Sequence, residues 1–219
     1  AYTDDGRLFM QDVEVTSASG SLWAPSETYF WPAEATLDFY AYAPYSGYGY
    51  GYSITEKKIT FDYTVPDKAT EQPDILFAHK ACSKASEGGT VELTFRHALA
   101  GVKFVAKNVT GCTVKRITLK GLYGQGSCTY VTDDTGKGTF AWTPSGEKRD
   151  FSEEFNVTLK DSEGETAQPI TDVKEETTFM LIPQTLEGVT VEVEVETDGE
   201  TFTLTGSLAQ TGAWEAGKI

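Results

Sequence analysis

The sequence predicts an all-β protein, an antiparallel sandwich or barrel, on three observations. Apolar and polar residues alternate along the clearest stretch, 189–208, as they do on strands with one buried face. Short runs rich in β-branched and aromatic residues recur along the chain, separated by clusters of Gly, Pro, Asp and Ser. No window of about 11 residues carries the apolar spacing of an amphipathic helix.

The stretch 189–208 predicts a β-hairpin with a defined register. Valine alternates with threonine or glutamate up to residue 196, and Asp198-Gly199 follows. A two-residue Asp-Gly loop favours a type I′ turn. That turn brings the apolar residues onto one face, with these opposing pairs: Val195 and Phe202, Val193 and Leu204, and, on the other face, Glu194 and Thr203.

Similar runs predict further strands at 8–15, 36–43, 58–65, 75–79, 91–95, 101–107, 114–119, 139–142, 155–159 and 178–182. The nearest approach to a helix is a turn at 84–88 or at 97–101. Both segments are too short to form a stable helix without tertiary support.

A chain of 219 residues is long enough for one or two domains. The composition changes near 121–126 (GLYGQG): residues 1–125 carry 12 basic and 14 acidic side chains, whereas residues 126–219 carry 6 and 19. Nine of the 11 tyrosines also lie at or before Tyr63. This asymmetry favours two domains, 1–125 and 126–219, although one elongated sandwich with unequal ends also fits.

Charge and hydropathy argue against two classes of partner. The net charge of -15 would repel the phosphates of nucleic acids and anionic lipid surfaces. No apolar run approaches the roughly 18 residues of a membrane span. Three cysteines, Cys82, Cys112 and Cys128, lack metal-site spacing and can form at most one disulfide. The printed residues begin without a charged and apolar leader, as expected of a cytosolic protein or of an exported protein after processing.

We find no motif for catalysis, for a cofactor or for a metal. The two histidines, His79 and His97, have no GxSxG serine to serve, and we expect His97 to be packed and hydrogen-bonded. No glycine-rich motif for nucleotide binding is present. The acidic pairs Glu153-Glu154 and Glu175-Glu176 point to opposite faces of a strand and fit solvated side chains better than glycosidase chemistry. The acidic turns at 133–136 and 161–165 fit ordinary Asx turns better than calcium loops.

The segment 45–52 is the most unusual in the chain. Tyr45, Tyr48, Tyr50 and Tyr52 are separated by Gly or Ser, and glycine supplies no side chain to a core strand. We expect a loop or hairpin tip. Its rings either fold back onto neighbouring strands or form a contact surface for a glycan or a protein.

Five phrases carry a resemblance to a known family: YFWPAEATLDFYAYAP (29–44), DILFAHKA (74–81), VELTFRHALAGVKFVAKN (91–108), FMLIPQTLEGVTVEVEV (179–195) and WEAGK (214–218). In this order they resemble the fimbrillin-like (Mfa-like) family of fimbrial and adhesion proteins on the surface of anaerobic diderm bacteria. The resemblance spans nearly the whole chain. The family's last phrase usually continues into another strand, whereas the printed sequence ends at Ile219.

The resemblance implies a fold, a location and a mode of assembly. The fold is two consecutive transthyretin-like antiparallel β-sandwich domains, and the protein is exported as a lipoprotein to the outer membrane. Subunits of such fimbriae are thought to join by strand exchange: a trypsin-like protease removes an N-terminal strand, and a strand from a neighbouring subunit replaces it. Arg7 is the only basic residue before Lys57 and is therefore the candidate processing site.

We therefore expect a non-enzymatic fimbrial subunit without a cofactor. Its expected partners are other fimbrial subunits and, for adhesion, a host or bacterial surface protein or glycan. The alternative is a surface glycan-binding module whose stacking platforms are Tyr48, Tyr50 and Tyr52. A hydrolase that uses scattered carboxylates is a third, weaker hypothesis.

Overall fold

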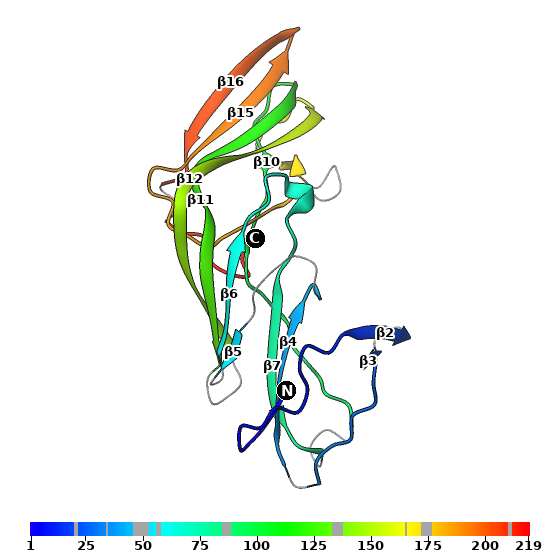
Figure 1. The fold of residues 1–219 in the computed structure, drawn as a ribbon. Helices are drawn as coiled ribbons and strands as arrows, with labels where there is room; N and C mark the ends of the chain where they lie inside the picture. The colour runs from blue at the N-terminus through cyan, green and yellow to red at the C-terminus, as the bar shows by residue number, and fades with distance from the viewer. Residues whose placement is uncertain are drawn as a thin grey trace.

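The computed structural model of the chain is built from antiparallel sheets (Figure 1). It describes residues 1–219 except 20, 21, 34, 46–52, 56, 57, 85–88, 133–137, 165, 172–176, 210 and 211. Every strand pairing in this described part is antiparallel. The prediction of an all-β sandwich is confirmed.

Two long strands, β11 (Cys112–Thr132) and β12 (Gly138–Leu159), pair with each other as the longest hairpin of the fold. Their pairing shifts register three times, between Val114 and Arg116, between Leu119 and Leu122, and between Tyr123 and Gln125. Such irregularities bend a strand pair, and here they let one hairpin serve both ends of the fold.

The side of β11 that faces away from β12 is shared by two strands. β15 (Thr190–Thr197) pairs with residues 113–120 and is flanked by β16 (Glu200–Ser207). β6 (Lys58–Thr64) pairs with residues 125–131 and is flanked by β5 (Ser53–Thr55). The large sheet therefore runs β16, β15, β11, β6 and β5, with β12 on the far side of β11. Figure 1 shows β11 and β12 curving along this large sheet, from β5 toward the part that contains β15 and β16.

A second, four-stranded sheet packs on the part of the large sheet that contains β6. Its order is β1 (Tyr2–Thr3), β4 (Leu37–Ala43), β7 (Leu76–Cys82) and β8 (Arg96–His97). Fully buried Phe77 of β7 joins the two layers. Its ring centroid lies 5.1 Å from that of Phe61 on β6, 5.8 Å from that of Tyr130 on β11 and 6.0 Å from that of Phe140 on β12.

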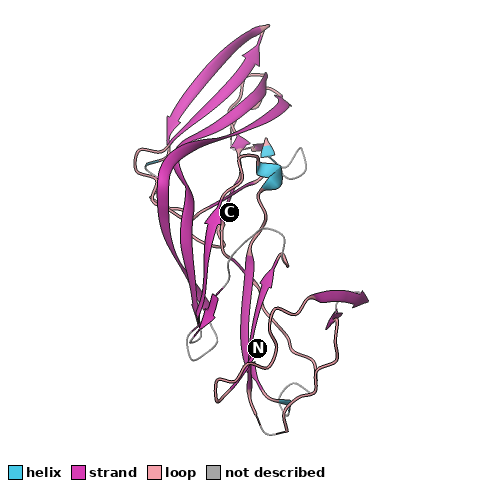
Figure 2. Ribbon diagram, in the orientation of Figure 1, coloured by secondary structure: helices cyan, strands magenta, loops and turns pink. Residues whose placement is uncertain are grey.

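Three short strand pairs complete the fold (Figure 2). They are β9 (Ala100–Val102) with β14 (Phe179–Leu181), β10 (Val105–Ala106) with β13 (Gln168–Pro169), and β2 (Val15–Ser19) with β3 (Leu22–Pro25). A 3₁₀ turn, η1 (Ala69–Glu71), follows β6. The first two pairs close the core beside β15, where the ring centroids of Phe104 and Phe179 are 6.2 Å apart.

The predicted hairpin at 189–208 is confirmed down to its register. Val195 pairs with Phe202, Val193 with Leu204, and Glu194 with Thr203. Asp198 and Gly199 have φ angles of 52° and 79°, as a type I′ turn requires.

Two predicted strands are wrong. Residues 8–15 are not one strand, because Asp12 at φ 45° interrupts the extended backbone: Leu8 makes only an isolated bridge, to Tyr2, and Val15 is the first residue of β2. Residues 91–95 alternate as a strand does but have no pairing partner in the described part of the chain. The prediction at 101–107 is divided between β9 and β10, and 97–101 forms strands rather than a helical turn.

The segment 121–126, where the composition changes, is a bend and not a linker. It lies inside the continuous strand β11, and one cluster of buried side chains contains residues from both sides of it. The division into domains 1–125 and 126–219 stays a prediction. Cys112 and Cys128 are free thiols on β11, and burial raises the pKa of the Cys128 thiol.

At this bend a side-chain amide replaces a neighbouring strand. Between the partners β15 and β6, Tyr123 donates its backbone N–H to Gln184 Oε1 at 2.8 Å, and Gln184 Nε2 donates to the Tyr123 carbonyl at 3.1 Å. Gln184 is only 7% exposed. Buried backbone groups need such partners, so this side chain holds the bend together.

We expect Gln184→Ala to lower the free energy of unfolding by about 2 kcal/mol, because two partly buried backbone groups of Tyr123 lose their partners. Urea denaturation measures this change as a lower midpoint at constant slope. Gln168→Ala is the matched control: Gln168 makes the same two bonds to the backbone of exposed Lys160, where water can replace them. Equal losses in the two variants would contradict this role of Gln184.

Candidate assembly site at the N-terminal turn

The first residues form a small surface hairpin, in which Arg7 lies opposite Thr3 where the turn of residues 4–6 closes. The Thr3 N–H donates to the Arg7 carbonyl at 2.8 Å, and the Gly6 N–H donates to the Thr3 carbonyl at 2.8 Å. Gly6 has a φ of 81°, which favours glycine at this point of the turn. The Tyr2–Leu8 bridge continues the hairpin beyond the turn.

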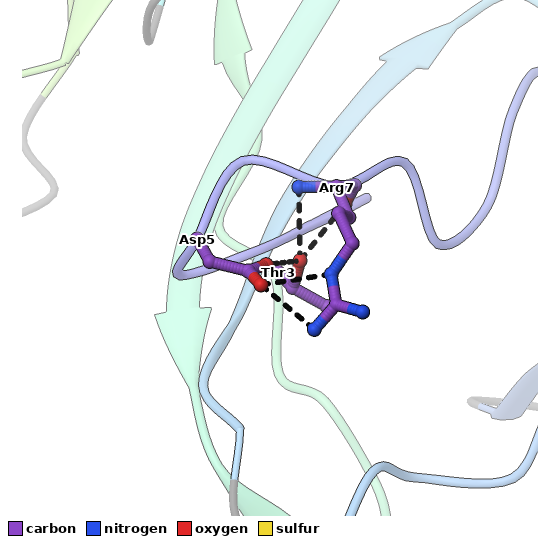
Figure 3. Close-up of polar contacts among 3 residues, drawn as sticks. All are labelled: Thr3, Asp5 and Arg7. Atoms are coloured by element: carbon purple, nitrogen blue, oxygen red, sulfur yellow. Dashed lines mark hydrogen bonds and ion pairs between the residues drawn. The ribbon is translucent and has the colours of Figure 1, made fainter.

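An ion pair and a hydroxyl fasten the Arg7 side chain across the turn (Figure 3). The Arg7 guanidinium donates from Nε to Asp5 Oδ2 at 2.8 Å, and the Thr3 hydroxyl donates to Asp5 Oδ1 at 2.5 Å. The hydrogen bond from Arg7, followed by that from Thr3, lowers the pKa of Asp5 to about 2. The pair therefore stays charged at neutral pH and is lost only as the pH falls through that value. The Arg7 side chain remains 81% exposed.

The hairpin covers one end of an otherwise open strand. Tyr2 pairs with Asp38 of β4 and Thr3 pairs with Leu37, while the Asp4 N–H donates to the Thr36 carbonyl at 3.1 Å. Residues 39–43 of β4 pair with β7 on one side, and no described strand pairs with them on the other. Removal of β1 would therefore leave the whole of β4 as an edge strand.

Aromatic side chains line this edge. The Tyr2 ring packs edge-on against Tyr40, with centroids 6.5 Å apart, and Trp31 packs against Phe39 at 5.6 Å. The residues of β4 after Leu37 are all partly exposed. Aromatic rings on a strand edge provide apolar area for an added strand.

Of the four tyrosines in the predicted contact loop, the structure describes one. Tyr45 is 38% exposed, stacks on Tyr42 with centroids 6.4 Å apart, and donates its hydroxyl to the Asp12 carbonyl at 3.2 Å. The Tyr42 hydroxyl donates to the Asp12 carboxylate. Tyr48, Tyr50 and Tyr52 lie outside the described residues.

Both histidines are paired with aspartates. His79 Nε2 lies 3.1 Å from Asp38 Oδ1, and its buried ring packs on Tyr40 with centroids 4.5 Å apart. His97 Nδ1 lies 2.8 Å from Asp74 Oδ2. The prediction of a hydrogen-bonded His97 is confirmed, but the prediction that it is packed is wrong, because its side chain is 53% exposed. The pairing of predicted strands 36–43 and 75–79 creates the His79 contact, and sequence patterns did not fix that pairing.

Three of the acidic candidates have contacts within the fold. Glu153 accepts the Ala69 N–H at 3.3 Å, Glu154 pairs with Arg116 at 2.7 Å, and Asp161 accepts the Gly111 N–H at 2.6 Å. Glu163 is exposed, whereas residues 133–137, 165 and 172–176, with the other acidic candidates, lie outside the described part. Among the described residues, no cluster of three or more His, Cys, Asp or Glu could hold a metal ion. Within the same ranges, no helix has the length and apolar character needed to cross a membrane.

The described part of the chain is an all-β sandwich in which β4 is paired along only part of its outer edge. A family model described as fimbrillin-like matches residues 3–219, so the chain belongs to the fimbrillin-like family. This membership supports a role as a structural subunit of fimbriae at the cell surface. A search of curated proteins finds no match to the chain.

We expect Asp5→Ala to speed cleavage after Arg7 by an arginine-specific protease by about two- to fivefold, since the Arg7 side chain no longer has to leave an ion pair to enter the protease. N-terminal sequencing and mass spectrometry over time measure the rate. Asp4→Ala is the control, because it removes the same charge but no hydrogen bond of the Arg7 guanidinium. If both variants accelerate cleavage equally, the hydrogen-bonded pair does not restrain Arg7.

Proposed function

We propose that this chain is a fimbrial subunit that assembles by donor-strand exchange after cleavage between Arg7 and Leu8. One observation carries the proposal: β1, the only described strand next to β4 on its outer side, is joined to the body through an exposed turn that contains Arg7. A protease that cuts this turn separates the covering segment from the rest of the chain.

Few contacts hold residues 1–7 to the rest of the protein once the turn is cut. This segment contacts β4 through two residue pairs and one further backbone hydrogen bond, from Asp4 to Thr36. It contacts the chain beyond the cut through the Tyr2–Leu8 bridge and through backbone hydrogen bonds of Ala1 with residues 9 and 10. A backbone hydrogen bond contributes roughly 1 kcal/mol to stability. Together these few bonds stabilise the segment by less than the conformational entropy that a short peptide gains when it is released. The segment therefore leaves after cleavage.

Release extends the open edge of β4 from residues 39–43 to all seven residues, Leu37–Ala43. Unpaired N–H and C=O groups and partly exposed aromatic rings along this edge favour the addition of another strand. A strand donated by a neighbouring subunit satisfies the backbone groups and covers Tyr40, which Tyr2 covers before cleavage. Coupling assembly to cleavage keeps the subunit from polymerising before it is exported.

We propose further that the subunit is exported as a lipoprotein, reaches the outer membrane and acts there in adhesion. These steps rest on the resemblance to fimbrillin-like proteins. Labelling of the expressed precursor with a radioactive fatty acid tests the lipid attachment, and its absence in producing cells would contradict this part of the proposal.

Protease treatment of the purified chain tests the assembly mechanism. We expect cleavage after Arg7 to convert monomers into a ladder of multimers that gel filtration and native electrophoresis resolve. Arg7→Ala should stay monomeric under the same treatment. Arg7→Lys should assemble after trypsin treatment, which cuts at lysine, but not after treatment with the arginine-specific protease.

Together, Arg7→Ala and Arg7→Lys distinguish an effect of cleavage from an effect of the arginine side chain itself. A monomer that persists after sequencing has verified a new N-terminus at Leu8 would exclude Arg7 as the trigger. Multimers formed by Arg7→Ala would exclude it as well.

A second candidate function is glycan binding through the tyrosine loop. The observation that favours it is the stacked pair of Tyr42 and Tyr45, which leaves the Tyr45 ring 38% exposed. Flat aromatic rings stack on the apolar faces of sugars at a low cost in conformational entropy. Tyr48, Tyr50 and Tyr52 extend the same sequence pattern.

If the loop binds glycans, we expect the combined substitution of Tyr45, Tyr48, Tyr50 and Tyr52 by Ala to weaken glycan-array binding by at least about tenfold without affecting polymerisation. Phe30→Ala is the control, because Phe30 is an aromatic residue outside the loop that is 83% exposed. Unchanged array binding in the quadruple variant would eliminate this second candidate.

A further inference from the structure

The last strand of the large sheet, β16, has an open edge. It pairs with β15 over its whole length, and no described strand pairs with its other side. All eight of its residues are exposed, and Figure 1 shows it at the outer margin of the fold. Eight residues is long for a strand, because about five or six is usual.

The apolar face of the large sheet continues onto β16. On β11, Ile117 is fully buried, and its neighbour Val193 on β15 is partly buried. Leu204, the next residue across the sheet, is 58% exposed, and Phe202 on the same face is 46% exposed. The face is therefore covered at its centre and uncovered at β16.

The other long edge of the sheet lacks these properties. β12 is 22 residues long, but its outer edge is interrupted by Pro144, by Gly146 at φ 76° and by Asn156 at φ 53°, and it carries the charged run 147–150. Proline, irregular backbone and charge are the features by which proteins prevent edge-to-edge pairing. β16 (ETFTLTGS) has no proline and no charged residue after Glu200.

We propose that β16 pairs antiparallel with β16 of a second copy of this chain, joining the two large sheets into one. The sequence of β16 is self-complementary about Thr203. With Thr203 opposite itself, Phe202 lies opposite Leu204 of the other copy on the apolar face, and Glu200 lies opposite Gly206. A shift by one residue in the pairing would place apolar side chains against polar ones.

The charges are compatible with this pairing in spite of the net charge of -15. The glutamates on the polar face of β15 each have a cationic partner: Glu192 with Lys120 at 2.7 Å, Glu194 with Arg116 at 3.9 Å and Glu196 with Lys115 at 3.5 Å. Two β16 strands would separate the β15 strands of the two copies by roughly 14 Å, which exceeds the screening length of about 8 Å at physiological salt.

The contact is small. One strand and two large apolar side chains from each copy bury less than the roughly 1,600 Å² of a standard stable interface. The dimer is therefore weak and reversible. It forms without cleavage at Arg7, so it is independent of the donor-strand mechanism and can be tested on the uncleaved chain.

Sedimentation velocity of the uncleaved chain tests the dimer. We expect the mass to rise with concentration from 23.9 kDa toward twice that value. Leu204→Lys should raise the dissociation constant by at least about tenfold, because it puts a lysine opposite Phe202 of the other copy. Val105→Lys should leave the constant unchanged, since Val105 on β10 is an equally exposed apolar residue at 59%. Both substitutions reduce the net negative charge equally, so charge alone cannot explain a difference.

Cysteine cross-linking tests the register. Directly opposed residues of antiparallel strands have Cα atoms about 4.5–5.5 Å apart, within the range that a disulfide spans. Under a mild oxidant, Thr203→Cys should yield a covalent dimer, and Thr143→Cys on exposed β12 should not. A chain that stays monomeric at millimolar concentration, a dimer that Leu204→Lys leaves intact, or equal cross-linking of the two cysteine variants would each overturn the proposal.

Discussion

The architecture depends on how the backbone of β11 is satisfied at its bend. β12 supplies a partner along one side, but the other side passes from β15 to β6 and leaves residues 121–124 without a strand. Two groups fill this gap: the Gln184 amide at Tyr123, and the Val65 N–H that donates to the Gly124 carbonyl at 2.8 Å. From β12, at the register shift between Leu119 and Leu122, the Asp150 carboxylate accepts the Gly121 N–H at 3.1 Å. Because these groups come from different segments, the bend fastens those segments to each other.

Arg149 links the bend to the loop before η1. Its guanidinium donates to Asp67 at 2.6 Å and to the Val65 carbonyl, and it lies 4.5 Å from the centre of the Phe151 ring. A Cβ at Gly124 would lie 2.2 Å from Arg149 Nε, so only glycine leaves room for this side chain. The loop before η1 is thereby held against β12. The two ends of the large sheet keep a fixed relation, and so do the edges that they present.

Sequence patterns predicted those parts of the fold that local physics decides. The hairpin at 189–208 was predicted in full, because Asp198-Gly199 selects the turn and the alternation selects the face. The length of β12 was missed, because Pro144 and the charged run 147–150 look like the end of a strand, yet both are accommodated on its unpaired edge. The prediction of a strand at 91–95 was wrong for the opposite reason. Apolar and polar residues alternate there, but whether a segment pairs as a strand depends on residues distant in the sequence. Arg7 was singled out by its place in the sequence, whereas the Asp5 and Thr3 contacts that hold it became visible only in the folded turn.

The open edges of β4 and β16 differ in what limits the addition of a strand. β1 covers Leu37 and Asp38 of β4, so a strand added along the whole of that edge competes with a segment of the same chain. An intramolecular strand has a high effective concentration, which protects the edge even though it makes few contacts. β16 has no such cover, and a contact that is always available must be weak if the protein is to remain soluble. The ion pairs that neutralise the glutamates of β15 permit that contact, while the rest of an acidic surface keeps copies of the chain apart. The two proposals therefore place two kinds of association on two different sheets: one that cleavage controls, at β4 of the four-stranded sheet, and a reversible one that concentration controls, at β16 of the large sheet.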